Sequence, residues 1–158
     1  MHMNRLAALF LLSLMLCACR VSVSTTPEKV TAQRGTAQER AEVVRVADSI
    51  ARDMDSGDFE TVWKESSQIL KDATFEVVFT KTLETARGNL ASSGKRGEVR
   101  VGFLKKLEAN LPEGEYSIVE IDTAFEGAAV TEKFVLTRES REWKLAGYFI
   151  NGTKRFGG

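Results

Sequence analysis

Residues 115–150 read EYSIVEIDTAFEGAAVTEKFVLTRESREWKLAGYFI, and the pattern within them predicts most of the sheet on which the domain is built. Apolar and polar residues alternate along it in three runs, which are separated by Gly127 and by Glu139-Ser140. A period of two is typical of a strand with one buried face, and short breaks between such runs are typical of hairpins. The stretch therefore predicts three consecutive antiparallel strands. We expect their inward side chains to be those of Val119, Ile121, Phe125, Val130, Phe134, Leu136, Trp143, Leu145 and Phe149.

A fourth strand is expected just before this stretch. Val99, Val101 and Phe103 alternate with polar or small residues, and residues 94–97 have the composition of a basic turn. The opposite, solvent-facing side of the sheet is expected to carry Glu120, Asp122, Glu126 and Tyr148. A sheet that is apolar on one side only needs helices to cover that side.

The covering helices are predicted from residues 36–90. Thr36-Ala-Gln-Glu39 matches the capping box that begins a helix, and apolar residues then recur at helical spacing. Ser56-Gly57 is expected to end this helix, and Asp58 to cap a short second one. A third run places Phe75, Phe79, Leu83, Ala86 and Leu90 on one face. Helices followed by strands predict an α+β domain, with N-terminal helices packed on a curved antiparallel sheet of about four strands.

The start of the chain has the pattern of an export signal. A basic beginning is followed by an apolar run, Leu6 to Ala18, of about thirteen residues, which is too short to cross the ~30 Å hydrocarbon core as a helix. Leu16-Cys17-Ala18-Cys19 resembles the lipobox of bacterial lipoproteins. The resemblance implies a signal peptide over residues 1–18, an acylated Cys19 as the new N-terminus, and a flexible tether over residues 19–36. A buried N-terminal helix and a secreted protein cut nearby are the alternatives.

The resemblance also implies a location. Lipoproteins of bacteria with two membranes are sorted by the residue after the acylated cysteine, and Arg20 at that position implies the outer membrane. We therefore expect a lipid-anchored protein of the cell envelope that faces the periplasm. Several acyl chains on Cys19 would make the anchor stable.

The composition excludes several classes of function from the part of the chain after Cys19. No histidine and no second cysteine follow this residue, so a Ser-His-Asp triad, a cysteine nucleophile and a histidine- or cysteine-ligated zinc are excluded there. Twenty-two basic residues balance twenty-two acidic ones, which argues against a nucleic-acid partner. Asp53-x-Asp55 resembles the beginning of a calcium loop, but the glycine comes one position early, at the fifth position, where an oxygen ligand is needed. We expect no cofactor and no metal.

Residues 40–151 resemble the DUF4019 family, a bacterial domain of unknown function. The residues that carry the resemblance are Asp55-Ser-Gly-Asp-Phe59, Leu83-Glu-Thr-Ala-Arg87, Pro112-Glu-Gly-Glu-Tyr116, Thr123-Ala-Phe-Glu126 and Trp143-Lys-Leu-Ala-Gly-Tyr-Phe-Ile150. The family is similar in layout to NTF2-like cones, in which helices close over a curved sheet and leave a cup. The resemblance implies a domain over residues 37–151 and a flexible tail over residues 152–158. It implies no activity, because folds of this kind host enzymes and binding modules alike.

Glu132 is the charged residue that the pattern places inside. It has the same strand parity as Val130 and Phe134, and a buried carboxylate must be paired or neutral. Arg87, next to the apolar stripe of the third helix, is its predicted partner. Three interpretations are open: a structural ion pair, a general base or ligand anchor in the cup, and a bulge that turns Glu132 outward.

The aromatic residues Trp63, Phe79, Phe125, Trp143 and Phe149 are candidates to line a ligand pocket, with plain core packing as the alternative. Together these observations predict a membrane-anchored, non-catalytic module that binds a small apolar ligand or an envelope protein. The alternatives are an acid/base enzyme that uses Glu132 and a purely structural lipoprotein.

Overall fold

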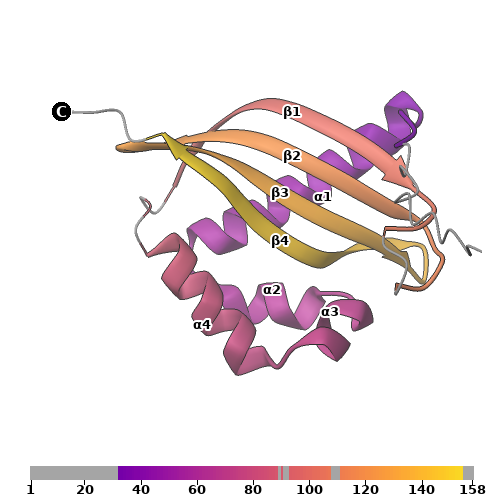
Figure 1. Ribbon diagram of the computed structural model, residues 1–158, viewed down its shortest axis with the longest axis horizontal. Coiled ribbons are helices and arrows are strands. Elements are labelled where there is room, and N and C mark those ends of the chain that lie inside the picture. The colour runs from indigo at the N-terminus through magenta and orange to yellow at the C-terminus, as the bar shows by residue number, and fades with distance from the viewer. Residues whose placement is uncertain (1–31, 89, 91–92, 108–110, 155–158) are drawn as a thin grey trace, which may run out of the picture.

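The computed structural model describes residues 32–88, 90, 93–107 and 111–154, and it confirms an α+β fold. Four helices precede four strands along the chain (Figure 1). The elements are α1 (Ala37–Asp55), α2 (Phe59–Glu65), α3 (Gln68–Ala73), α4 (Glu76–Arg87), β1 (Lys95–Leu104), β2 (Tyr116–Phe125), β3 (Ala128–Glu139) and β4 (Glu142–Lys154). Among the helices of these residues, none combines the length and the hydropathy needed to cross a bilayer.

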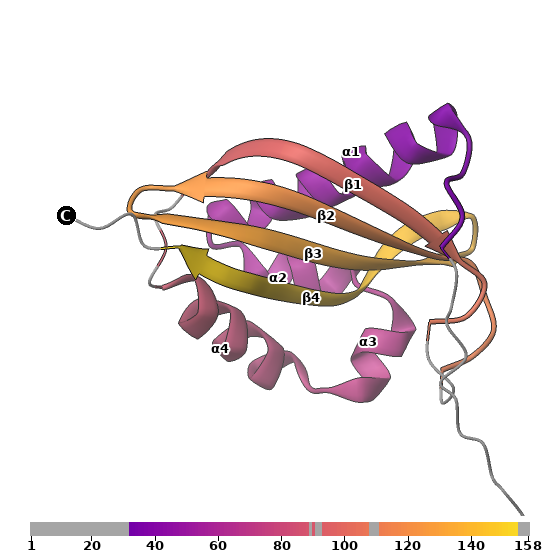
Figure 2. The ribbon, with the colours of Figure 1, turned by 45° about the horizontal axis from the view of Figure 1, so that its top comes forward.

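The strands form an open antiparallel meander in the order β1-β2-β3-β4. All four helices lie on one side of this twisted sheet, and Figure 2 shows the other side free of helices. The core lies between the two layers. It consists of Val43, Ala47, Ala51, Met54, Val62, Leu70, Phe79, Leu83, Val119, Ile121, Phe134, Leu136, Trp143 and Leu145.

Both ends of α1 and the start of α2 lie where the sequence predicts them. The Thr36 side chain accepts a hydrogen bond from the backbone N–H of Glu39, whose carboxylate accepts one from the Thr36 N–H, so the predicted capping box is present. Gly57 has a φ of +78°, a conformation that favours glycine, and the Asp58 side chain caps α2. The acidic segment around Asp55 is therefore a helix end followed by a cap, as the sequence predicts.

The apolar stripe predicted for the third helical run is only partly right. Phe79 and Leu83 are buried in α4, but Phe75 and Ala86 are exposed. Phe75 lies outside because the helix begins at Glu76, so that Phe75 is its extended N-cap residue and not part of the helical period. A further helix, α3, was not predicted, because six residues are too few to show a period.

The prediction of an inward Phe149 and an outward Tyr148 is wrong. Val135 pairs with Gly147 while the next residue, Leu136, pairs with Leu145, so β4 has one extra residue at this point. This β-bulge reverses the inward and outward positions for the rest of the strand. Tyr148 packs against the core, and the Phe149 side chain is 53% exposed on the helix-free side.

Strands β1 and β4 are longer than the sequence predicts. Lys95 and Arg96, which were expected in a turn, open β1, and the pairing register shifts between Arg96 and Val99. Strand β4 continues past residue 151 and ends at Lys154. Arg96 is consequently held by the sheet and points into the interior.

Candidate functional site

The structure brings Arg87 and Glu132 together, as the sequence predicts. The Nη1 atom of Arg87 donates a hydrogen bond of 2.8 Å to Oε1 of Glu132. Arg87 is the last residue of α4, and Glu132 lies in the middle of β3 at an inward position between Val130 and Phe134. The pair therefore joins the helical layer to the sheet.

Glu132 is fully buried and its carboxylate accepts two further hydrogen bonds. Tyr148 donates to Oε1 at 2.7 Å, and the Thr123 hydroxyl donates to Oε2 at 2.6 Å. Arg87 Nη1 also donates to the Tyr148 oxygen at 2.8 Å. Both oxygens of Glu132 are thus occupied by donors of the protein itself.

A second carboxylate and a second guanidinium complete the site. Arg87 Nη2 contacts Asp55 at the end of α1, and Arg96 Nη1 lies 2.8 Å from the other oxygen of Asp55. Arg96 Nη2 lies 3.9 Å from Glu132 Oε2. We call Asp55, Arg87, Arg96 and Glu132 the ionic cluster. Its two positive and two negative charges balance, which is what low solvent exposure demands of charged groups.

The environment keeps Arg87 and Tyr148 protonated. Burial by itself lowers the pKa of Arg87, but its interactions with Tyr148, Glu132 and Asp55 outweigh burial and raise that pKa. Burial, followed by the nearby charge of Glu132, raises the pKa of Tyr148. Arg87 also lies over the ring of Phe125, with its Cζ atom 5.4 Å from the ring centroid. The site is therefore a network of fixed hydrogen bonds and ion pairs.

A pocket of about 280 Å³ borders the cluster where α1 and α4 end. Asp55 and Arg87 belong to its walls, together with Phe59, Glu84 and Gly88. Glu132 does not line this pocket, because it lies deeper, in the sheet. A molecule in the pocket could reach the edge of the cluster but not the carboxylate of Glu132.

The five aromatic candidates do not surround one cavity. Trp63 and Phe79 pack on each other in the core with ring centroids 5.5 Å apart, while Phe125 is buried beside Arg87. Trp143 is buried against Phe103, with centroids 6.1 Å apart. It contributes to two small pockets of about 180 and 200 Å³. Phe149 lies on the other side of the sheet.

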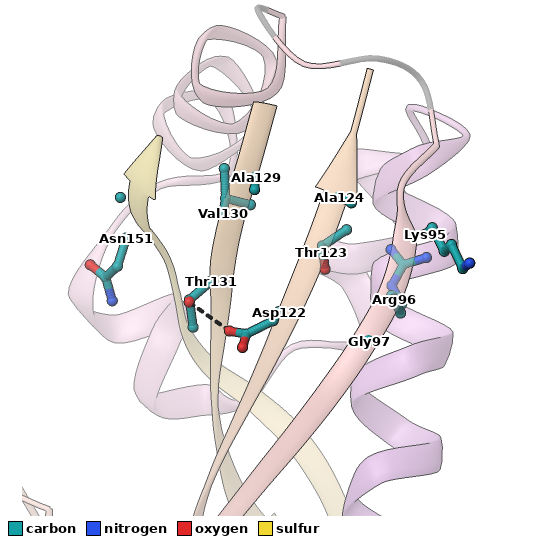
Figure 3. A pocket seen from close by; sticks show the side chains of 11 residues that line it. Lys95, Arg96, Gly97, Asp122, Thr123, Ala124, Ala129, Val130, Thr131 and Asn151 are labelled. Atoms are coloured by element: carbon teal, nitrogen blue, oxygen red, sulfur yellow. Dashed lines mark hydrogen bonds between the residues drawn. The ribbon is translucent and has the colours of Figure 1, made fainter. Parts of the chain in front are cut away.

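The helix-free side of the sheet carries a pocket of about 530 Å³ (Figure 3). Lys95 and Arg96 line it on one side and Asn151 on the other, with Asp122 and Thr131 between them. Asp122 accepts two hydrogen bonds from Arg100, at 3.0 and 2.8 Å, and one from Thr131. The Arg100 hydrogen bonds lower the pKa of Asp122 to about 2. The acidic stripe predicted to face solvent is thus partly neutralised by Arg100.

Sequence reasoning missed four residues of the site, namely Asp55, Arg96, Thr123 and Tyr148. A signal for Asp55 was present, because it follows Val43, Ala47 and Ala51 at steps of four and so continues the buried stripe of α1. Thr123 has the inward parity of Ile121 and Phe125. No pattern in the sequence indicated Tyr148, whose inward orientation depends on the bulge.

Several predictions fall on residues that the structure does not describe. The signal peptide, Cys19 and most of the tether lie outside the described residues, as do residues 155–158 of the tail. Within the described ranges, no group of three or more acidic, histidine or cysteine side chains is arranged to hold a metal ion.

Neither the curated proteins nor the solved structures gave a match. The model of one protein family, described as a protein of unknown function, matches residues 46–148. These residues include all four members of the ionic cluster, namely Asp55 on α1, Arg87 on α4, Arg96 on β1 and Glu132 on β3. The chain belongs to the DUF4019 family.

Proposed function

We propose that this protein is a non-catalytic binding module that an acylated Cys19 holds in the cell envelope. The observation that carries the proposal is the state of Glu132, which is fully buried and accepts hydrogen bonds from Arg87, Tyr148 and Thr123. A general base must reach the proton of its substrate directly or through one water molecule. Glu132 does not have that access, which counts against the acid/base alternative.

The location is proposed from the sequence. The short apolar leader and the lipobox-like Leu16-Cys17-Ala18-Cys19 support export and acylation, and Arg20 supports sorting to the outer membrane. A tether before α1 would let the domain face the periplasm at some distance from the lipid surface. The layout of helices over one side of a sheet is consistent with a relationship to NTF2-like cones.

An envelope protein is the better supported of the two kinds of partner. The aromatic residues that could have lined an apolar cup lie in the core or on opposite sides of the sheet. A small apolar ligand needs a concave site that covers most of its surface. A protein partner can instead use exposed side chains, and Phe75, Val77, Val78, Val99 and Phe149 are apolar and exposed.

The anchor and the binding activity can be tested in one experiment. The full-length protein and its Cys19→Ser variant are produced in a bacterium with two membranes, and intact cells are treated with a short amine cross-linker before fractionation. We expect wild type in the outer-membrane fraction with one reproducible cross-linked protein, and the variant in the soluble fraction without it. Retention of Cys19→Ser in the membrane, or absence of any specific adduct from wild type, contradicts the proposal.

A further inference from the structure

The beginning of α4 carries apolar side chains that are exposed to solvent and not packed in the core. Phe75 is 76% exposed, Val77 65% and Val78 52%. The opposite side of the same helix carries Phe79 and Leu83, which are buried in the core. We call Phe75, Val77 and Val78 the α4 patch. Contiguous exposed apolar residues of this kind mark interaction surfaces in soluble domains.

Local structure does not account for Phe75. It is the N-cap residue of α4, and its side chain cannot accept a hydrogen bond from the first turn. N-cap positions favour Ser, Thr, Asp and Asn, and the caps of the other three helices are Thr36, Asp58 and Ser67, each with a side-chain hydrogen bond. Phe75 therefore neither stabilises the helix end nor fills the core.

The charges around the patch indicate what it would bind. A pocket of about 470 Å³ lies here, lined by Glu60, Phe75, Glu76, Val77 and Thr80. Both carboxylates are exposed, and neither forms an ion pair with a cation of the described residues. An apolar hollow between two free negative charges is complementary to an apolar side chain flanked by positive ones.

We propose that the α4 patch docks a protein segment in which an apolar side chain, inserted between Phe75 and Val77, is flanked by Lys or Arg residues that face Glu60 and Glu76. This inference rests on the proposed function and specifies the chemistry of the protein partner. The negative charges disfavour an anionic lipid surface as the occupant, because such surfaces attract basic segments.

A selection of peptides against the full chain in detergent tests the inference. A displayed library of random peptides is enriched on the wild-type protein, and the selected peptides are synthesised and titrated. Phe149→Ser is the matched control for Phe75→Ser, because Phe149 is an exposed phenylalanine on the helix-free side of the sheet. We expect peptides with an aromatic or aliphatic residue beside Lys or Arg. Phe75→Ser should weaken their binding about tenfold or more, and Phe149→Ser should leave it unchanged.

The charges are tested separately from the apolar contact. The double variant Glu60→Gln, Glu76→Gln should weaken the same peptides about three- to tenfold and reduce the dependence of Kd on salt. Circular dichroism checks that each variant is folded. Because all four substituted residues are exposed, we expect unchanged spectra.

Failure of this inference can be told from failure of the proposed function. Peptides that bind Phe75→Ser as well as wild type, peptides without basic residues, or no enrichment at all overturn the docking surface. The envelope cross-link and the release by Cys19→Ser do not depend on those results. A change in sedimentation between wild type and Phe75→Ser would mean that a second copy of the chain covers the patch, which also overturns the inference.

Discussion

Glu132 shows how a single charged residue can be kept inside a small sheet. An isolated carboxylate in an apolar interior costs several kcal/mol, so its position is stable only if charged and hydrogen-bonding partners converge on it. Arg87, Arg96, Thr123 and Tyr148 supply these partners from a helix and three strands. The burial of Glu132 is therefore stable only when the helical layer and the sheet are assembled.

Removing the charge of Glu132 should destabilise the domain strongly. In Glu132→Gln the two guanidinium groups of the cluster retain only Asp55 as a counter-charge, and we expect a loss of about 3–5 kcal/mol in the free energy of unfolding. Urea unfolding followed by circular dichroism measures it. Glu126→Gln, an exposed acid at the turn after β2, is the matched control and should change stability by less than ~0.5 kcal/mol. A loss below ~1 kcal/mol for Glu132→Gln would refute the structural importance of the cluster.

The pKa of Asp122 predicts how the stability of the domain changes at acidic pH. Its pKa falls from 3.8 to about 2 in the folded protein, chiefly because Arg100 donates to its carboxylate. The ionised form is thus favoured by folding, so Asp122 stabilises the fold above pH 3.8 and loses this contribution as the pH falls towards 2. The urea midpoint of Asp122→Asn should therefore vary less than that of wild type between these values. Asp72→Asn is the control, and equal slopes for Asp122→Asn and wild type would contradict the prediction.

The pairing of Arg87 with Glu132 could be predicted from the sequence because each residue lies in a regular element whose period is visible. Asp55 could have been added by the same reasoning, since it extends the four-residue steps of α1. Arg96 could not, because residues 94–97 contain two glycines and resemble a turn. Pairing with β2 holds this segment as a strand, and tertiary pairing of that kind overrides local preference.

At the scale of the elements, the bulge in β4 decides which aromatic side chain reaches the cluster. One extra residue between Leu145 and Gly147 turns Tyr148 inward and Phe149 outward. Strict alternation, the rule by which the sheet was predicted, gives the opposite result beyond this point. The sheet and its strand order could be predicted because the alternation that indicates them extends over many residues. The bulge is a single extra residue, and it leaves no recognisable pattern in the sequence.

Deleting Ala146 tests the importance of the bulge. Without this residue Leu145, Gly147 and Tyr148 follow one another in regular alternation opposite Leu136, Val135 and Phe134, so Tyr148 keeps its inward position. Glu132 then keeps its Tyr148 donor, and we expect the deletion to destabilise the domain less than Tyr148→Phe does, measured by thermal unfolding. Deletion of Ser140, which lies in the hairpin turn before β4, serves as a comparison. A destabilisation larger than that of Tyr148→Phe would contradict this register.

At the scale of the whole molecule, the helical layer is attached to the sheet in two different ways. Towards the ends of α1 and α4 the attachment is ionic, through Asp55 and Arg87. Near the beginning of β4 it is apolar, through Trp143, which belongs to the same core cluster as buried residues of α1 and α2. An open sheet whose helices cover only one side needs attachment along its length, because its core is thin. The exposed α4 patch takes part in neither attachment.

The two attachments should act independently. Trp143 and Tyr148 are five residues apart on β4, or about 16 Å along a strand. Their aromatic, cation–π and hydrogen-bonding partners differ, being Phe103 and Arg138 for Trp143 and Phe134, Arg87 and Glu132 for Tyr148. We expect Trp143→Phe and Tyr148→Phe each to cost about 1–3 kcal/mol, and the double variant to cost their sum within ~0.5 kcal/mol. Urea unfolding of the four proteins completes the cycle, with the fluorescence of Trp63 as a probe common to all of them. A coupling above ~1 kcal/mol would show instead that the ionic and apolar ends are one structural unit, because a loss at either end would then already have loosened the other.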